Sequence, residues 1–136
     1  MTTRQREPRR EDPKYLKWIR LQPCVQCAWE GRAVFGCEAA HVKIGISEHG
    51  WREHGGGERS HDDHAVSLCP SCHRTGKNAQ HRTGERKFWL RLGMCPACLC
   101  TSLRSCYEAG EPGVSAIWDA VHAAKQAPTD HKKKKK

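Results

Sequence analysis

The chain has 136 residues, of which only 37% are hydrophobic, so a core made of side chains alone would be small and a structural metal ion would supplement it. It contains no run of about 18 apolar residues, and its first residues are charged, which argues against a membrane span or a secretory signal and predicts a cytoplasmic protein. Five of the 24 basic residues lie in 132–136, which leaves 19 basic against 15 acidic residues, and this balance favours a polyanionic partner such as nucleic acid.

The first half of the chain predicts a helix and two strands. Residues 1–13 form a basic arm without apolar periodicity, which we expect to be disordered. Tyr15, Trp18 and Ile19 follow helical spacing within 14–21, and Pro23 ends this predicted helix. Short strands are expected at 33–35 and 39–42. The polar insert over 43–61, which includes three consecutive glycines at 55–57, indicates a flexible loop.

The second half predicts one more strand and three helices. The strand ends at Leu68, and a helix is expected over 79–92, with Gly93 as its terminator. Helices over 97–109 and 114–125 follow. We therefore expect an α+β core at 14–93, a helical appendage at 94–126 and a basic tail at 127–136.

Two Cys-x2-Cys pairs give the strongest chemical signal. Each pair can place two thiolates on one side of a tight turn, and two such turns complete a four-sulfur zinc site. An odd number of cysteines and the lack of an export signal favour thiolate–metal bonds over a disulfide framework. The zinc would be structural, because four thiolates leave no coordination position for water. The predicted ligands are Cys24, Cys27, Cys69 and Cys72.

Other cysteines and histidines allow two interpretations. His49, His54 and His61 lie in or beside the polar insert, where we favour exposed imidazoles over metal ligands. The later cysteines could bind a second zinc ion, but their helical spacing favours small core residues. Cys37 is expected to be unligated. The later cysteines are Cys95, Cys98, Cys100 and Cys106.

A wider pattern surrounds the two Cys-x2-Cys turns, Cys24–Cys27 and Cys69–Cys72, which we call the cysteine knuckles. It spans about residues 14–93. It runs from Tyr15-Leu16-x-Trp18-Ile19-Arg20 and Pro23-Cys24 through Ala39-Ala40-His41-Val42 and Asp62-Asp63 to Leu68-Cys69-Pro70-Ser71-Cys72-His73 and His81-x2-Gly84-Glu85-x2-Phe88-Trp89. This layout resembles the HNH (ββα-metal) nuclease superfamily, and more narrowly the phage Ref-like recombination nucleases. The resemblance implies a zinc-stapled ββα-metal core and a protein encoded by a phage or prophage and active in the bacterial cytoplasm.

The resemblance also implies a set of catalytic residues. His41 would be the general base that takes a proton from an attacking water. A divalent cation, Mg²⁺, Mn²⁺ or Zn²⁺, would be held by His73 with His81 and Asp62, and would stabilise charge on the phosphate. Asp63 is the other candidate carboxylate, as a ligand or as a partner that orients an imidazole.

The sequence departs from the usual family pattern in three places. Ala40 stands where relatives usually have a metal ligand, and His64 stands where the middle Asn is expected. His73 and His81 are eight residues apart, which on one continuous helix is about 12 Å and too far to share an ion. We therefore expect residues 74–78 to form a loop that breaks the helix and brings His81 back close to His73.

These patterns predict a metal-dependent DNA endonuclease. The alternative is a non-catalytic zinc module that binds nucleic acid with the same basic surface, and it is favoured by the departures from the family pattern. A third, weaker interpretation is a structural or packaging protein with a relic fold. No helix suited to reading bases is evident, so we expect phosphate contacts to dominate any DNA binding.

Overall fold

The computed structural model describes residues 9–54 and 60–126. Three predicted features lie outside these residues: most of the N-terminal arm, the glycine run at 55–57 and the basic tail at 127–136. Within them, no helix is long and apolar enough to cross a membrane. The elements, in chain order, are α1 (Pro13–Arg20), α2 (Val25–Trp29), β1 (Glu38–His41), η1 (Ser47–His49), β2 (Ala65–Leu68), η2 (Ser71–Thr75), α3 (Gln80–Thr83), α4 (Glu85–Leu92), α5 (Pro96–Glu108) and α6 (Val114–Gln126).

Helix α1 forms where the apolar spacing predicts it. The Asp12 side chain caps its first turn by accepting a hydrogen bond from the Tyr15 amide, and Pro13 occupies the first helical position. Tyr15 and Ile19, which share one face of the helix, are fully buried. The helix therefore packs on the core as expected.

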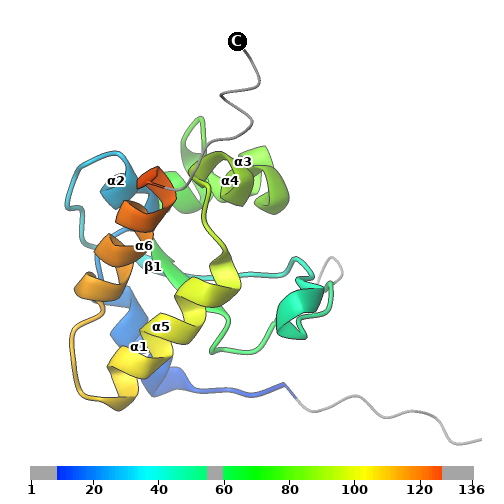
Figure 1. The fold of residues 1–136 in the computed structure, drawn as a ribbon, viewed down its shortest axis with the longest axis vertical. Helices are drawn as coiled ribbons and strands as arrows, with labels where there is room; N and C mark the ends of the chain where they lie inside the picture. The colour runs from blue at the N-terminus through cyan, green and yellow to red at the C-terminus, as the bar shows by residue number, and fades with distance from the viewer. Residues whose placement is uncertain (1–8, 55–59, 127–136) are drawn as a thin grey trace, which may run out of the picture.

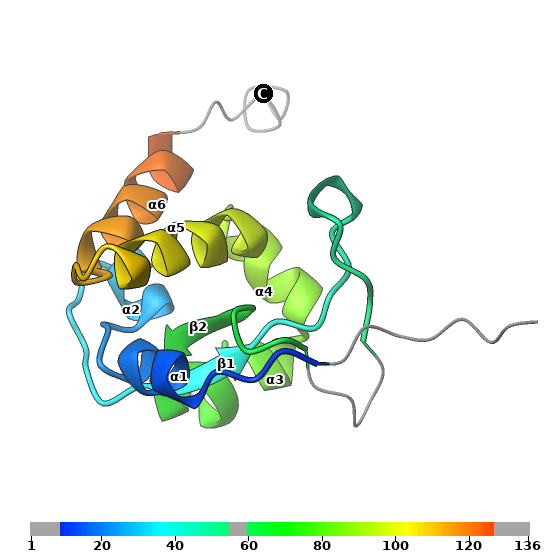
Figure 2. The ribbon, with the colours of Figure 1, turned by 90° about the horizontal axis from the view of Figure 1, so that it is seen from below.

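A two-stranded antiparallel sheet lies at the centre of the molecule. Ala40 of β1 pairs with Val66 of β2, and His41 pairs with Ala65. Every residue of β2 is buried, because α1 covers one face of the sheet and α5 covers the other (Figure 2). The sheet therefore holds His41 at the end of a rigid strand.

The prediction of a strand at 33–35 was wrong. Among residues 9–54 and 60–126, this segment pairs with no strand; instead, the Val34 carbonyl accepts a hydrogen bond from the Cys24 amide at 2.8 Å. Phe35 is 60% exposed. The segment serves as a support for the first cysteine knuckle rather than as part of the sheet.

The single helix expected over 79–92 was also wrong. The chain forms two short helices, α3 and α4, which meet at Gly84. Gly84 has φ 98°, a conformation that other residues rarely adopt, so the helix cannot continue through it. Gly93 ends α4 with φ 69°, as predicted.

Helices α5 and α6 belong to the same core as the sheet. Figure 1 shows α5 lying across the sheet with α6 beside it. Leu99 and Leu103 of α5, with Ile117 and Val121 of α6, are buried in one cluster with Val66 and Tyr15. The helical segment is thus an integral layer of the fold.

The insert after β1 is more ordered than its composition suggests. Ile46 pairs with Trp51 across the short turn η1, and Trp51 stacks on His64 with ring centroids 3.7 Å apart. The Glu85 carboxylate of α4 accepts hydrogen bonds from the Lys43 and Ile44 amides. These contacts correct the expectation of an unpacked loop for residues 43–54.

Candidate metal centres and the histidine groove

Four buried cysteines form a cluster between the two predicted knuckles. The Sγ atom of Cys27 lies 3.9 Å from that of Cys69 and 3.7 Å from that of Cys72, and all four ligand atoms, including that of Cys24, lie within 4.8 Å of one another. Thiolates bound to one tetrahedral zinc lie about 3.8 Å apart. The cluster can therefore hold a structural metal such as zinc.

The backbone prepares both knuckles. Cys24 caps α2, and its Sγ accepts a hydrogen bond from the Cys27 amide at 3.5 Å. Cys69 follows β2 directly, and its carbonyl accepts a hydrogen bond from the His73 amide at 2.8 Å. The turn that closes the second knuckle thus also fixes the backbone of His73.

His73 and His81 meet side by side. Their Nε2 atoms are 3.2 Å apart, and the rings are nearly perpendicular. Two imidazole nitrogens on one divalent cation lie about 3.0–3.4 Å apart, given metal–nitrogen bonds of about 2.0–2.1 Å. The helix break expected after His73 is present, because η2 ends at Thr75 and α3 begins only at Gln80. The pair can provide two nitrogen ligands.

Glu38 orients this pair from the opposite side. Its carboxylate contacts His73 Nδ1 at 2.7 Å and the Arg74 guanidinium at 2.6 Å. The hydrogen bonds from Arg74 and His73 hold the pKa of Glu38 below its usual value. A carboxylate on the second ring nitrogen fixes the tautomer that presents Nε2 to a metal.

Electrostatics favours a neutral His81. Partial burial, followed by the positive charges of His73, Lys43 and Arg74, lowers the pKa of His81. A neutral imidazole is the form that binds a metal ion.

A second histidine centre joins His41 to Asp62. His41 Nε2 lies 2.9 Å from Asp62 Oδ1, and the Asp62 side chain also accepts hydrogen bonds from Arg9 at 2.6 Å and from the Asp12 amide at 2.7 Å. Burial acts to raise the pKa of Asp62, which is 2% exposed, but these hydrogen bonds outweigh it and lower the pKa. Asp62 therefore remains ionised and orients His41.

A groove of about 530 Å³ joins the two histidine centres. His41 lines it from the end of β1, and His81 lines it from α3. Basic side chains share its walls with two carboxylates, Glu53 and Glu85. Glu53 pairs with Arg86 at 2.7 Å, and Glu85 is held by the backbone of the insert. The groove-lining basic residues are Lys43, Arg86 and Lys87.

A family model described as "protein of unknown function (DUF968)" matches residues 2–105. The chain belongs to the DUF968 family. The matched region contains the four-cysteine cluster and both histidine centres and continues into α5. Comparison with curated proteins gives no match, and neither does comparison with solved structures.

The predicted carboxylates of this DUF968 protein occupy different surroundings. Asp62, expected as a metal ligand beside His73, instead directs both oxygens to His41, Arg9 and the Asp12 amide. Asp63 lies outside the groove lining and forms an ion pair with Arg10 at 3.3 Å. Of the two, Asp62 has the contacts of a residue that positions the proposed base.

Ala40 and His64, the two residues that replace expected HNH residues, are both packed in the structure. Ala40 is 0% exposed within the sheet, and its methyl side chain has no atom that could bind a metal ion. His64 stacks on Trp51, and burial lowers its pKa to about 4. His64 therefore acts as a packed aromatic residue in the DUF968 fold.

Sequence reasoning gave a second zinc at the later cysteines only as the less favoured alternative, and it missed His49 as a partner of these cysteines and Glu38 as a partner of His73. His49 is exposed as expected, but its ligand atom lies within 4.8 Å of those of Cys95 and Cys98, which we had expected to be small core residues. The Cys-x2-Cys spacing was the available signal, and exposed Cys98 does not suit a core position. Cys100 is buried as expected, and Cys37 contacts the Val34 carbonyl. Glu38 carried no recognisable spacing signal, whereas Glu85 belongs to the quoted motif, where a surface pair or helix cap was favoured over a functional role; its carboxylate instead accepts hydrogen bonds from the insert backbone.

Proposed function

We propose that this DUF968 protein is a metal-dependent DNA endonuclease of the HNH type. The observation that carries the proposal is the groove lined both by His41, which Asp62 orients, and by His81, which pairs with His73. A phosphodiesterase needs a base for water and a cation for the phosphate, and one groove brings candidates for both together.

In the proposed mechanism, His41 is the general base. Asp62 holds the imidazole in place and favours the protonated ring that forms when His41 takes a proton from the attacking water. A positioned base of this kind contributes about 10²- to 10⁴-fold in rate.

His73 and His81 are the proposed ligands of the catalytic ion, with Glu38 as the residue that positions His73. Bound there, Mg²⁺, Mn²⁺ or Zn²⁺ would supply positive charge to the phosphate and its departing oxygen. Oxygen ligands from phosphate and water suit the remaining coordination positions.

DNA is the proposed substrate because the groove offers contacts for phosphates. Lys43, Arg86 and Lys87 line the groove that contains His41. Contacts from Lys and Arg to phosphates give affinity without sequence preference, and this agrees with the basic composition of the chain.

A non-catalytic module that binds nucleic acid is the second candidate, because buried Ala40 removes a ligand that HNH nucleases usually have. A supercoiled-plasmid assay with Mg²⁺ or Mn²⁺ separates the two functions. We expect the wild type to nick the plasmid and His41→Ala to bind but not cut it. His122→Ala, which changes an exposed histidine on α6, is the matched control and should cut normally.

Each outcome assigns a role. Zinc content and thermal unfolding establish that the variants are folded. If every folded protein shifts the plasmid on a gel without cutting it, the binding module is the function. If His41→Ala cuts as fast as the wild type, His41 is not the general base.

A further inference from the structure

A second cluster of metal-binding side chains lies away from the histidine groove. His49 Nε2, at the end of η1, is 3.7 Å from Cys95 Sγ and 3.6 Å from Cys98 Sγ. A thiolate sulfur and an imidazole nitrogen bound to one tetrahedral zinc lie about 3.6 Å apart. The three ligand atoms therefore have the spacing of one zinc ion.

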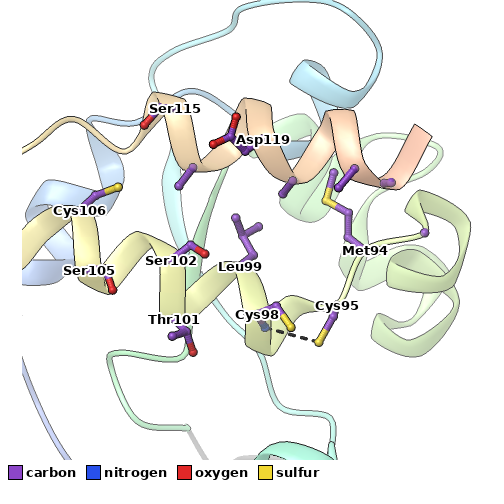
Figure 3. Close-up of a pocket in the computed structure, with 15 residues that line it drawn as sticks. Met94, Cys95, Cys98, Leu99, Thr101, Ser102, Ser105, Cys106, Ser115 and Asp119 are labelled. Atoms are coloured by element: carbon purple, nitrogen blue, oxygen red, sulfur yellow. Dashed lines mark hydrogen bonds between the residues drawn. The ribbon is translucent and has the colours of Figure 1, made fainter. Parts of the chain in front are cut away.

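The Cys95–Cys98 turn repeats the geometry of the first zinc knuckle. Cys95 caps α5 and its Sγ accepts a hydrogen bond from the Cys98 amide at 3.4 Å, as Cys24 caps α2 and accepts from the Cys27 amide at 3.5 Å. Figure 3 shows the Cys95 and Cys98 side chains at the start of α5, with the dashed line running from the Cys98 amide to the Cys95 sulfur. Both turns thus prepare two thiolates for one ion.

We propose that His49, Cys95 and Cys98 hold a second zinc ion, which links the insert after β1 to the start of α5. Three protein ligands leave the fourth position to water, which reaches this site because His49 and Cys98 are exposed. The proposal is independent of nuclease activity, since it rests on ligand geometry alone.

The tie would stabilise one wall of the histidine groove. The insert carries Lys43, Ile44, Glu53 and His54, which all line the groove. At the strand end it is held by Glu85, and the stacking of Trp51 on His64 attaches it a second time. A zinc ion at His49 would add a third attachment, at the tip of the insert.

Zinc counting by mass spectrometry on the full-length protein tests the proposal. After dialysis against a weak chelator, Cys95→Ser/Cys98→Ser should contain one zinc per chain less than the wild type. The difference between proteins is the measured quantity, because the four-cysteine cluster and the His73–His81 pair can also bind zinc. Cys106→Ser, a half-buried cysteine later on α5, is the control and should keep the wild-type count.

A second measurement follows the insert itself. In His49→Ala, hydrogen exchange at the Ile46, Trp51 and His54 amides should become at least about tenfold faster, while the amides of β2 remain protected. Cobalt substitution should show one set of thiolate-to-metal bands lost from the double-cysteine variant. Equal zinc counts in wild type and the double variant, or a Cys95–Cys98 disulfide in wild-type protein purified under mildly reducing conditions, would overturn the proposal.

Discussion

The Nε2 atoms of His73 and His81 lie 3.2 Å apart although the residues are eight positions apart in sequence. A continuous helix would separate them by about 12 Å. The chain closes this distance by ending η2 at Thr75 and turning at Gly76, whose amide bonds to the Ser71 carbonyl at 2.7 Å. The turn at Gly76 is therefore what brings the two imidazoles together.

Gly76→Ala should disturb this turn. An added Cβ would lie 2.6 Å from Ser71 Oγ and 2.7 Å from the Ser71 carbonyl oxygen, so the backbone must shift. We expect a loss of about 1–3 kcal/mol in the free energy of unfolding and weaker Mn²⁺ binding by the histidine pair, measured by urea denaturation and calorimetry. Asn78→Ala, an exposed change in the same loop, should behave as the wild type. Unchanged Mn²⁺ affinity in Gly76→Ala would show that the pair does not depend on the turn.

Asp62→Asn and Asp63→Asn should differ sharply in activity. Asp62 orients His41, so its loss should slow plasmid nicking by about 10²- to 10⁴-fold while DNA binding remains. Asp63 pairs with Arg10 outside the groove, so Asp63→Asn should keep nicking within about threefold of the wild type. The two rates are measured at equal zinc content. The reverse order of effects would assign the positioning role to Asp63.

His64 should make stability depend on pH between about 6.5 and 4. Burial, with the charges of His61, Arg10 and His54, lowers its folded-state pKa to about 4, against the opposing effect of Asp63. Between these values the unfolded chain binds more protons than the folded protein, so stability is present above pH 6.5 and is lost as the pH falls toward 4.

The matching variant is His64→Phe, which keeps an aromatic ring against Trp51. Urea denaturation at several pH values should show the wild type losing about 1–3 kcal/mol more than His64→Phe across this range. Acid release of zinc affects both proteins and cancels in the difference. Parallel pH profiles would contradict the lowered pKa.

Leu103→Ala should show that α5 is part of the core. Leu103 is fully buried, so its truncation should cost about 2–5 kcal/mol in the free energy of unfolding. Leu90→Ala removes a side chain that is 75% exposed and should stay within about 0.5 kcal/mol of the wild type. Differential scanning calorimetry distinguishes the two. A single unfolding transition that moves to lower temperature in Leu103→Ala is expected, whereas a second, separate transition would make α5 and α6 an independent unit.

Local patterns predicted the parts of the fold that local chemistry determines. Helix α1 follows from the spacing of Tyr15 and Ile19, and the four-cysteine cluster follows from two short repeats whose turns prepare their ligands. Residues 33–35 have strand-like composition, but the Val34 carbonyl accepts its hydrogen bond from the Cys24 amide, and the sheet in the described part of the chain consists of β1 and β2.

Contacts between distant segments were not predictable in the same way. His49 meets Cys95 and Cys98 across more than 45 residues, and no spacing rule relates them. Asp62 and Asp63 are adjacent and chemically identical, so only the fold, through Arg9 and the Asp12 amide, selects Asp62 as the partner of His41.

The four-cysteine cluster also has a consequence for synthesis on the ribosome. Cys27 and Cys69 are 42 residues apart, so the first knuckle is made well before its partner exists. Synthesis adds about 5–20 residues per second, so roughly 2–8 seconds pass between the synthesis of Cys27 and that of Cys69. During this time only two thiolates are present, which are too few ligands for a tetrahedral ion. Tyr15 and Ile19 remain without their full set of packing partners for longer, because Leu103 and Ile117 belong to the same buried cluster and are made later. The nascent chain therefore exposes the Cys24 and Cys27 thiols until Cys69 and Cys72 have been made, and the apolar face of α1 until Ile117 has been made.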